Sequence, residues 1–149
     1  MVDQGPDPAA LEATVTACRE LIERRFPDGD HQGAAAVLLG DGTILTGTSP
    51  DFVNPSTEVC HELEPYCAAY RLDQRIVASV CLHRDPDRGF VVLSPCGICR
   101  ERLTRHGPDV LAAVAEPADP TVPRWLPLRD LLPHYWLTAF PGATETWRA

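Results

Sequence analysis

The chain has no lysine, so each of its thirteen basic residues is an arginine, and twenty-one acidic residues outnumber them. The formal net charge is −8, and the arginines are not gathered into a basic run. A protein that holds a nucleic acid strand needs clustered positive side chains against the phosphates. The composition therefore excludes large nucleic acids as partners.

The sequence also lacks an apolar stretch long enough for a membrane-spanning helix. Residues 1–7 form an acidic segment without the apolar core of a signal peptide. We therefore expect a soluble, cytoplasmic protein with no membrane partner. Its 149 residues suffice for one domain with a buried core, and 44% hydrophobic residues are typical of globular proteins. We predict a single domain over residues 1–149.

Apolar spacing predicts an α/β protein. Leu11, Val15 and Ile22 recur at helical spacing, whereas nearly continuous apolar runs later in the chain are typical of buried strands. Pro65 predicts a distortion after the first turn of its helix. The order predicts an α/β sandwich around a mixed sheet of about five strands. The predicted helices are 7–26, 58–73, 96–106 and 128–135. The predicted strands are 33–39, 43–46, 75–83, 90–93 and 110–114, with 122–126 as an optional last strand.

Three cysteines and a glutamate have the spacing of a hydrolytic zinc site. Without an export signal the cysteines are expected to be reduced, which favours metal binding over disulfides. Cys60, Cys96 and Cys99 are candidate thiolate ligands, and a catalytic Zn2+ takes three protein ligands and leaves its fourth position to water. Glu62 is too offset to be a ligand but can exchange protons with that water. An irregular loop over residues 47–57, as active sites often have, directly precedes this group.

Two other interpretations of the cysteines stay open. His61 or His106 would complete a purely structural zinc site with four protein ligands, and Cys96 with Cys99 would form a redox-active pair. Neither interpretation gives a role to Glu62. The remaining cysteines are interpreted as small core residues: Cys18, Cys67 and Cys81.

The motif Cys60-His61-Glu62, followed by Pro95-Cys96-Gly97-Ile98-Cys99, resembles the zinc site of the cytidine deaminase superfamily. Segments 41–47, 99–101 and 131–133 resemble the small cytidine and blasticidin-S deaminases, so the resemblance spans about residues 30–136. It implies a three-layer cytidine-deaminase-like sandwich with a bound Zn2+. It also implies hydrolytic removal of the ring amine from a cytosine-type aminopyrimidine, with release of ammonia.

The resemblance further implies a small-molecule substrate, namely cytidine, deoxycytidine or a cytosine nucleoside antibiotic such as blasticidin S, and assembly as a homotetramer. Counting back from Cys60, the ribose-binding Asn and Glu of the family fall on Ser49 and Asp51, which are shorter. A non-catalytic, zinc-stabilised binding or scaffold protein is the alternative from another class. The altered sugar-contact positions permit that alternative, whereas the intact Glu62 speaks against it.

Charge balance at the metal is a second departure from the family. Leu63 stands where nucleoside-specific cytidine deaminases carry an arginine, and blasticidin-S deaminases resemble this chain in having leucine. Three thiolates on a divalent ion leave one net negative charge. Arg100 and Arg88 are the predicted compensating cations, with Arg102 third.

Backbone groups near Ser94 and Pro95 are expected to orient the ring amine of the substrate. Four further residues have open roles. His31 either contacts the substrate base or is a surface residue, and His61 is expected to contact the core or a neighbouring subunit. Tyr135 and Trp136 either close the pocket or pack on the sheet.

Overall fold

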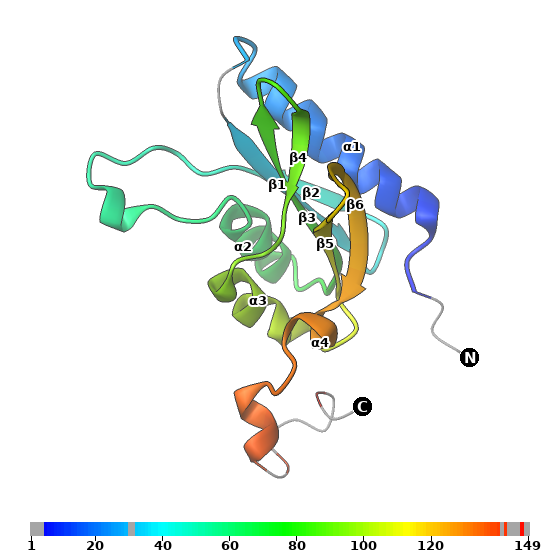
Figure 1. The fold of residues 1–149 in the computed structure, drawn as a ribbon. Coiled ribbons are helices and arrows are strands. Elements are labelled where there is room, and N and C mark those ends of the chain that lie inside the picture. The colour runs from blue at the N-terminus through cyan, green and yellow to red at the C-terminus, as the bar shows by residue number, and fades with distance from the viewer. Residues whose placement is uncertain (1–4, 30–31, 141, 143–146, 148–149) are drawn as a thin grey trace.

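A computed structural model describes residues 5–29, 32–140, 142 and 147 (Figure 1). Its helices are α1 (Pro8–Arg25), α2 (Leu63–Arg71), α3 (Gly97–Leu103) and α4 (Leu128–Leu131), with 3-10 turns η1 (Pro55–Thr57), η2 (Thr104–His106) and η3 (Trp136–Ala139). Its strands are β1 (Gly33–Leu39), β2 (Ile44–Gly47), β3 (Ile76–Asp85), β4 (Gly89–Leu93), β5 (Leu111–Glu116) and β6 (Asp119–Pro127). The candidate base contact His31 lies outside the described residues.

Helix α1 begins where the sequence provides both a cap and a proline. The Asp7 side chain accepts a hydrogen bond from the backbone N–H of Ala9 at 3.1 Å, and Pro8 occupies the first turn, where its missing N–H costs nothing. Val15, Cys18 and Ile22 are buried on one side, as the helical spacing predicts.

The strands form one mixed sheet of six, where about five were predicted. The order is β2-β1-β3-β5-β6, and β4 pairs with β3 beside β5. Strand β3 is antiparallel to β4 over Cys81–Asp85 and parallel to β5 at Ala78 and Ser79. Two strands thus share one edge of β3, and the chain that leaves β4 leads to α3, which lies next to α2 (Figure 1).

Alternating side chains of β1 divide the core into two layers. Ala34 and Ala36 pack toward α1, whereas Val37 and Leu39 join the cluster that contains residues of α2 and α3. Figure 1 accordingly shows α1 on one face of the sheet and α2 and α3 on the other. The three-layer sandwich predicted for the chain is confirmed.

The predicted start of the second helix is wrong. Helix α2 begins at Leu63, five residues later than predicted, because the preceding segment runs as an extended loop from β2 through η1. Pro65 therefore falls in the first helical turn, where no backbone N–H is needed, and it causes no distortion there. Cys60 and His61 consequently precede the helix instead of lying on its surface.

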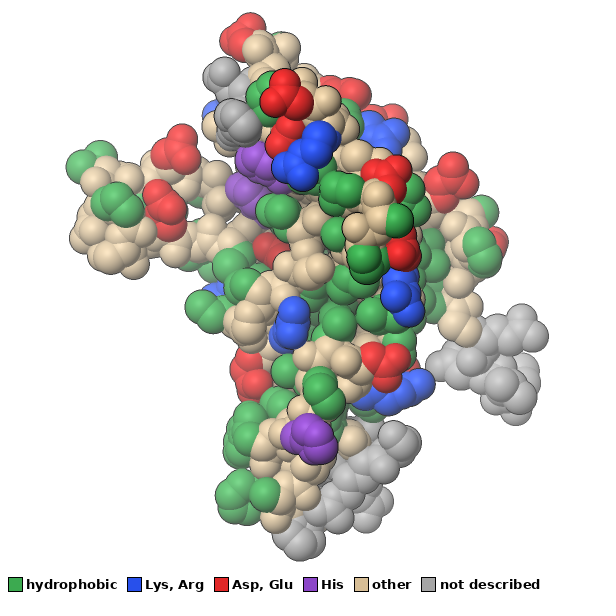
Figure 2. All heavy atoms as spheres, viewed as in Figure 1, with side chains coloured by type: hydrophobic (Ala, Val, Ile, Leu, Met, Phe, Trp, Pro, Cys, Tyr) green, Lys and Arg blue, Asp and Glu red, His purple; other side chains and the backbone are tan. Residues whose placement is uncertain are grey.

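Figure 2 shows acidic side chains spread over one face of the molecule, with fewer basic side chains between them. On that face the described residues form no continuous basic patch, in keeping with the net charge of −8. Among the helices that the structure describes, none has the length and apolar character to cross a membrane.

Candidate metal and proton-transfer site

The structure brings Cys60, Cys96 and Cys99 together. Cys60 ends the long loop before α2, and Cys96 caps α3 with extended backbone so that Cys99 follows in the first helical turn. The Sγ atoms of Cys60 and Cys96 are 3.5 Å apart, and all three sulfur atoms lie within 4.8 Å of one another. Tetrahedral zinc with Zn–S bonds of about 2.3 Å places sulfurs about 3.8 Å apart, so this donor set fits the ion.

Burial acts to raise the pKa of all three thiols, whereas the neighbouring thiols raise the pKa of some and lower that of others. Burial raises the pKa of Cys60 and of Cys99, and the neighbouring thiols and Glu62 contribute in the same direction at Cys99. Burial also acts upward on Cys96, but hydrogen bonds from the Cys99 and Ile98 backbone and from the other thiols outweigh it, so the pKa of Cys96 is lowered. A cation among the three sulfurs would favour the thiolate form of each and so oppose the effect of burial on Cys60 and Cys99.

Glu62 is a buried carboxyl group next to the sulfur atoms. Its side chain is 6% exposed, and burial raises the pKa of the carboxyl above its ordinary value. A hydrogen bond with Cys99 and the charge of Arg102 oppose that shift without reversing it. A carboxyl group held closer to neutrality in this way can both take and return a proton.

A cavity of about 390 Å³ opens beside these groups. Its lining includes the predicted residues Ser49, Asp51 and Ser94 together with Glu62. Pro95 is not in the lining, and its carbonyl oxygen accepts a hydrogen bond from Nε of Arg100 at 2.8 Å. The cavity lies within the range of about 300–1,000 Å³ that is usual for small-molecule sites.

The predicted compensating arginines have different partners. Arg88 sits in the β3–β4 turn, where it binds the Asp85 carboxylate at 2.8 Å and is 59% exposed, away from the sulfur atoms. Arg100 donates from Nε to Pro95 and from NH1 to the Leu131 carbonyl at 3.2 Å, so it holds the turn that carries Cys96. Of the three arginines, Arg102 is the one that acts electrostatically on Glu62.

His61 has a role that the sequence pattern did not reveal. Its Nδ1 atom lies 3.1 Å from the backbone nitrogen of Ser49 and 2.9 Å from the Ser49 hydroxyl oxygen. We expected a contact with the core or a neighbouring subunit. No local signal indicates the contact, because Ser49 and His61 are 12 residues apart on either side of an irregular loop.

The carboxyl-terminal aromatics lie away from the cysteines. Tyr135 is 6% exposed, its ring centroid lies 4.6 Å from that of Trp147 with the planes tilted by 55°, and its hydroxyl donates to Glu101 at 2.8 Å. Trp136 is 59% exposed on η3. Neither residue lines the cavity that contains Glu62.

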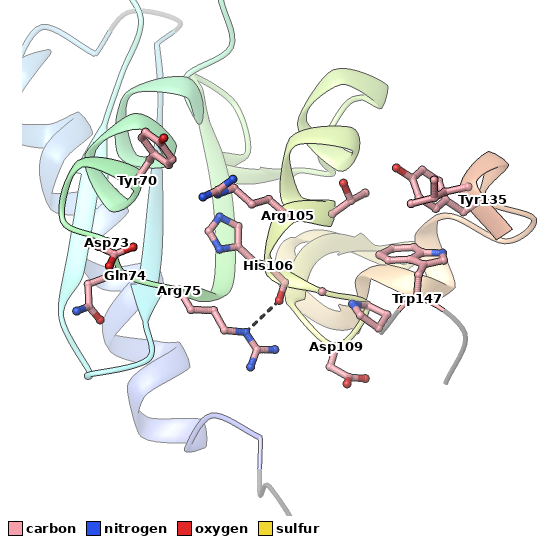
Figure 3. A pocket seen from close by; sticks show the side chains of 13 residues that line it. Tyr70, Asp73, Gln74, Arg75, Arg105, His106, Asp109, Tyr135 and Trp147 are labelled. Carbon is pink, nitrogen blue, oxygen red and sulfur yellow. Dashed lines mark hydrogen bonds between the residues drawn. The ribbon is translucent and has the colours of Figure 1, made fainter. Parts of the chain in front are cut away.

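A larger cavity, of about 1040 Å³, lies on another part of the molecule (Figure 3). Arg105 lies over the ring of Tyr70 at 4.8 Å, and Nε of Arg75 donates to the His106 carbonyl at 3.0 Å. Its lining contains none of the clustered cysteines and no buried carboxyl group. The smaller cavity is therefore the candidate site, because hydrolytic chemistry needs the groups gathered there.

Comparisons with known proteins agree with this geometry. No protein-family model matches the chain. The fold superposes on the crystal structure of the cytidine deaminase from Bacillus anthracis with a TM-score of 0.82 and 35% identity, covering 93% of this chain and 98% of that one. Blasticidin-S deaminase from Bacillus cereus is 27% identical over 105 residues, 67% of this chain and 75% of that protein. Cytidine deaminase from Mycobacterium tuberculosis is 35% identical over 74 residues, 49% of this chain and 53% of that protein.

Proposed function

This chain belongs to the cytidine deaminase superfamily, and from that premise we propose that it is a zinc-dependent hydrolytic deaminase. The proposed reaction converts a cytosine-type aminopyrimidine and water to the uracil-type product and ammonia. The observation that carries the proposal is the convergence of three sulfur atoms within 4.8 Å beside the buried Glu62, which lines one cavity together with Cys60 and Cys96.

We propose that Cys60, Cys96 and Cys99 hold the zinc ion. Their spacing fits tetrahedral thiolate ligation, and they leave one coordination position without a cysteine. When bound, Zn2+ supplies Lewis acidity, which makes a water molecule acidic enough to be a nucleophile near neutral pH. Arg100 holds the Pro95 carbonyl, and the resulting turn geometry keeps Cys96 opposite Cys60.

Glu62 performs the proton transfers in this proposal. It accepts a proton from the attacking water, and it delivers this proton to the ring nitrogen of the aminopyrimidine. The second proton of the water passes through the same carboxylate to the departing amine, which leaves as ammonia while the ring carbon keeps the oxygen. The raised pKa of this buried carboxyl suits a group that alternates between both protonation states.

The substrate class has two candidates within this activity. Cytidine or deoxycytidine is supported by the likeness to the Bacillus anthracis cytidine deaminase over 98% of that chain. A blasticidin-S-type, antibiotic-inactivating activity is supported by the relative from Bacillus cereus and by the short side chains of Ser49 and Asp51. Ammonia release from cytidine, deoxycytidine, blasticidin S and a set of aminopurines discriminates between them.

The decisive experiment is Glu62→Gln, which keeps the size of the side chain but cannot transfer a proton. We expect stoichiometric zinc in the purified variant and a loss of turnover of at least about 10²- to 10⁴-fold. Glu12→Gln, on the exposed side of α1, is the matched control and should behave like the wild type. Full activity in Glu62→Gln would refute its role. Zinc in a wild-type protein that is inactive on the whole panel would favour the non-catalytic scaffold instead.

We further propose a homo-oligomer, a tetramer by likeness to small deaminases, a cytoplasmic location, and one domain over residues 1–149. Light scattering at micromolar concentration tests the assembly, and a monomer would count against it. Limited proteolysis tests the single domain, because a second folded unit would survive as a separate stable fragment.

A further inference from the structure

The ring of His61 fills a space that Gly33 leaves open. A Cβ atom built on Gly33 would lie 2.5 Å from Nε2 and 2.8 Å from Cδ2 of the ring, closer than atoms of a packed core approach. The ring thus lies against the first residue of β1 on one side and reaches the loop after β2 on the other. His61 directly follows Cys60, so it links the candidate metal site to that loop.

The hydrogen bonds around Nδ1 fix which partner donates. A backbone N–H can only donate, so the 3.1 Å contact from the Ser49 nitrogen requires an unprotonated Nδ1. The Ser49 hydroxyl then donates its single hydrogen to the same atom across 2.9 Å. The Thr48 hydroxyl, 3.3 Å away, does not compete, because it donates to the Gly33 carbonyl at 2.7 Å. The neutral ring therefore carries its proton on Nε2.

The same loop is tied to α2 by a second set of contacts. The backbone N–H of Thr48 donates to Glu64 at 2.8 Å, and a Cβ on Gly47 would lie 2.5 Å from Cδ of Pro65. These contacts hold the end of β2 close to the first turn of α2. Ser49, the first residue of this loop that lines the 390 Å³ cavity, is instead hydrogen-bonded to His61.

With its hydrogen donated to His61, the Ser49 oxygen has only lone pairs to offer to the cavity. It therefore accepts a hydrogen bond, and the substrate group opposite must be a donor. A freely rotating serine would serve donors and acceptors alike. The histidine thus converts a small, adaptable side chain into one of fixed polarity.

We propose that His61 is a positioning residue, which holds Ser49 as an acceptor facing the cavity and so selects a substrate that presents a hydroxyl donor at this point. The inference rests on the proposed deaminase function. His61 itself touches neither the reacting ring nor the metal in this role, so its effect is on binding and not on the chemical step.

Kinetics of His61→Leu and His61→Asn on cytidine test the role. The leucine removes the acceptor, and we expect KM to rise about 5- to 10-fold at nearly unchanged kcat, the effect of one lost hydrogen bond. Asn offers a side-chain oxygen near the position of Nδ1, and it should restore most of the affinity. Zinc content is measured in each variant, because the position adjoins Cys60. A KM unchanged in His61→Leu with zinc and fold intact overturns the proposal.

Gly33→Ala perturbs the His61 ring without altering His61 itself. The added methyl group would lie 2.5 Å from Nε2 of the ring and 2.9 Å from the backbone carbonyl oxygen of Leu82, so KM should rise as in His61→Leu and thermal stability should fall as well. Gly40→Ala is the matched glycine control, since its Cβ meets only ordinary contacts at 3.8 and 3.9 Å. In a cycle with Ser49→Ala, the effects of His61→Leu and Ser49→Ala should be non-additive. Additive effects, or equal effects of the two glycine variants, overturn the proposal.

A readout that does not need activity separates this inference from the proposed function. Nitrogen NMR of the zinc-loaded wild type should show His61 with an unprotonated Nδ1 and a protonated Nε2. The opposite tautomer overturns the inference even if cytidine is deaminated. If the panel shows no deamination but the tautomer and the Ser49 contact are found, the proposed function fails while the positioning geometry stands.

The selection of a donor is tested with cytidines that lack one sugar hydroxyl or carry fluorine in its place. At one sugar position both changes should lower kcat/KM in the wild type by about the same factor, because neither analogue donates. In Ser49→Ala, which lacks the acceptor, kcat/KM for the same analogues should equal kcat/KM for cytidine. Equal losses in wild type and Ser49→Ala at every position overturn the donor assignment.

Discussion

Tyr66→Phe should destabilise the fold through a buried hydroxyl pair beneath the candidate site. The Tyr66 hydroxyl lies 3.0 Å from Oγ of Ser79, and the two side chains are 7% and 5% exposed. Burial raises the pKa of Tyr66, so the pair is neutral at all ordinary pH values. The same residue donates its backbone N–H to the Glu62 carbonyl at 3.1 Å, which ties the pair to the carboxyl-bearing turn.

The magnitude follows from what the substitution leaves behind. Tyr66→Phe removes one hydroxyl and leaves Oγ of Ser79 buried without its partner, which costs about 1–3 kcal/mol. In a chain of this length that corresponds to a Tm lower by about 3–9 °C. Ser79→Ala likewise leaves the buried Tyr66 hydroxyl without its hydrogen-bond partner, and it should lower the unfolding free energy by a similar amount.

Urea unfolding of the two single variants and of the double variant is the assay. Removing both hydroxyls leaves no unpaired polar group, so the double variant should be clearly more stable than the sum of the single effects implies. The reasoning would be refuted if the two losses simply added. In that case the hydroxyls do not depend on each other, and solvent or other groups satisfy them.

Three further perturbations probe the fold and the metal site. His106 accepts a hydrogen bond at Nδ1 from the Ile76 backbone N–H at 3.1 Å, and burial together with the charges of neighbouring arginines lowers its pKa below 6.5. The unfolded chain therefore binds the proton first, so this contribution to stability is present above about pH 6.5 and is lost as the pH falls. Urea midpoints should drop less between pH 8 and pH 5.5 in His106→Asn than in the wild type, and an identical drop contradicts this. Cys99→Ala should abolish zinc binding, measured as metal content and as the loss of chelator-sensitive thermal stability; stoichiometric zinc in this variant would exclude Cys99 as a ligand. Gly47→Ala places a methyl group 2.5 Å from Pro65 and should lower the unfolding free energy by about 1–3 kcal/mol, whereas a neutral result would show that β2 can move away from α2.

The sequence predicted the elements that depend on local pattern. The amphipathic spacing in α1 and the apolar runs of β1 and β3 are properties of neighbouring residues, and each element formed where it was predicted. The cysteine and glutamate motif consists of two short segments, residues 60–62 and 95–99, and each is recognised from neighbouring residues alone. For this reason the family and the three-layer fold followed from the sequence.

The sequence-based predictions were wrong where contacts between residues far apart in the sequence determine the structure. The start of α2 was placed too early, because apolar spacing cannot show that residues 58–62 are extended in a loop. Arg88 was nominated for charge balance from composition alone, but the β3–β4 turn places it on Asp85. The pairing of β4 with β3 beside β5 also depends on the packing of the whole sheet.

By itself the sequence indicated the three thiols and the carboxyl group that we propose carry the chemistry, and it indicated the helix and strand pattern around them. Only the tertiary structure decided that Cys60 meets Cys96, which lies 36 positions further along the chain, that Glu62 is buried, and that His61 holds Ser49. The physical reason is that secondary structure follows from short-range sterics and periodicity, whereas these distances are set by how α2, α3 and the loop after β2 pack on one sheet.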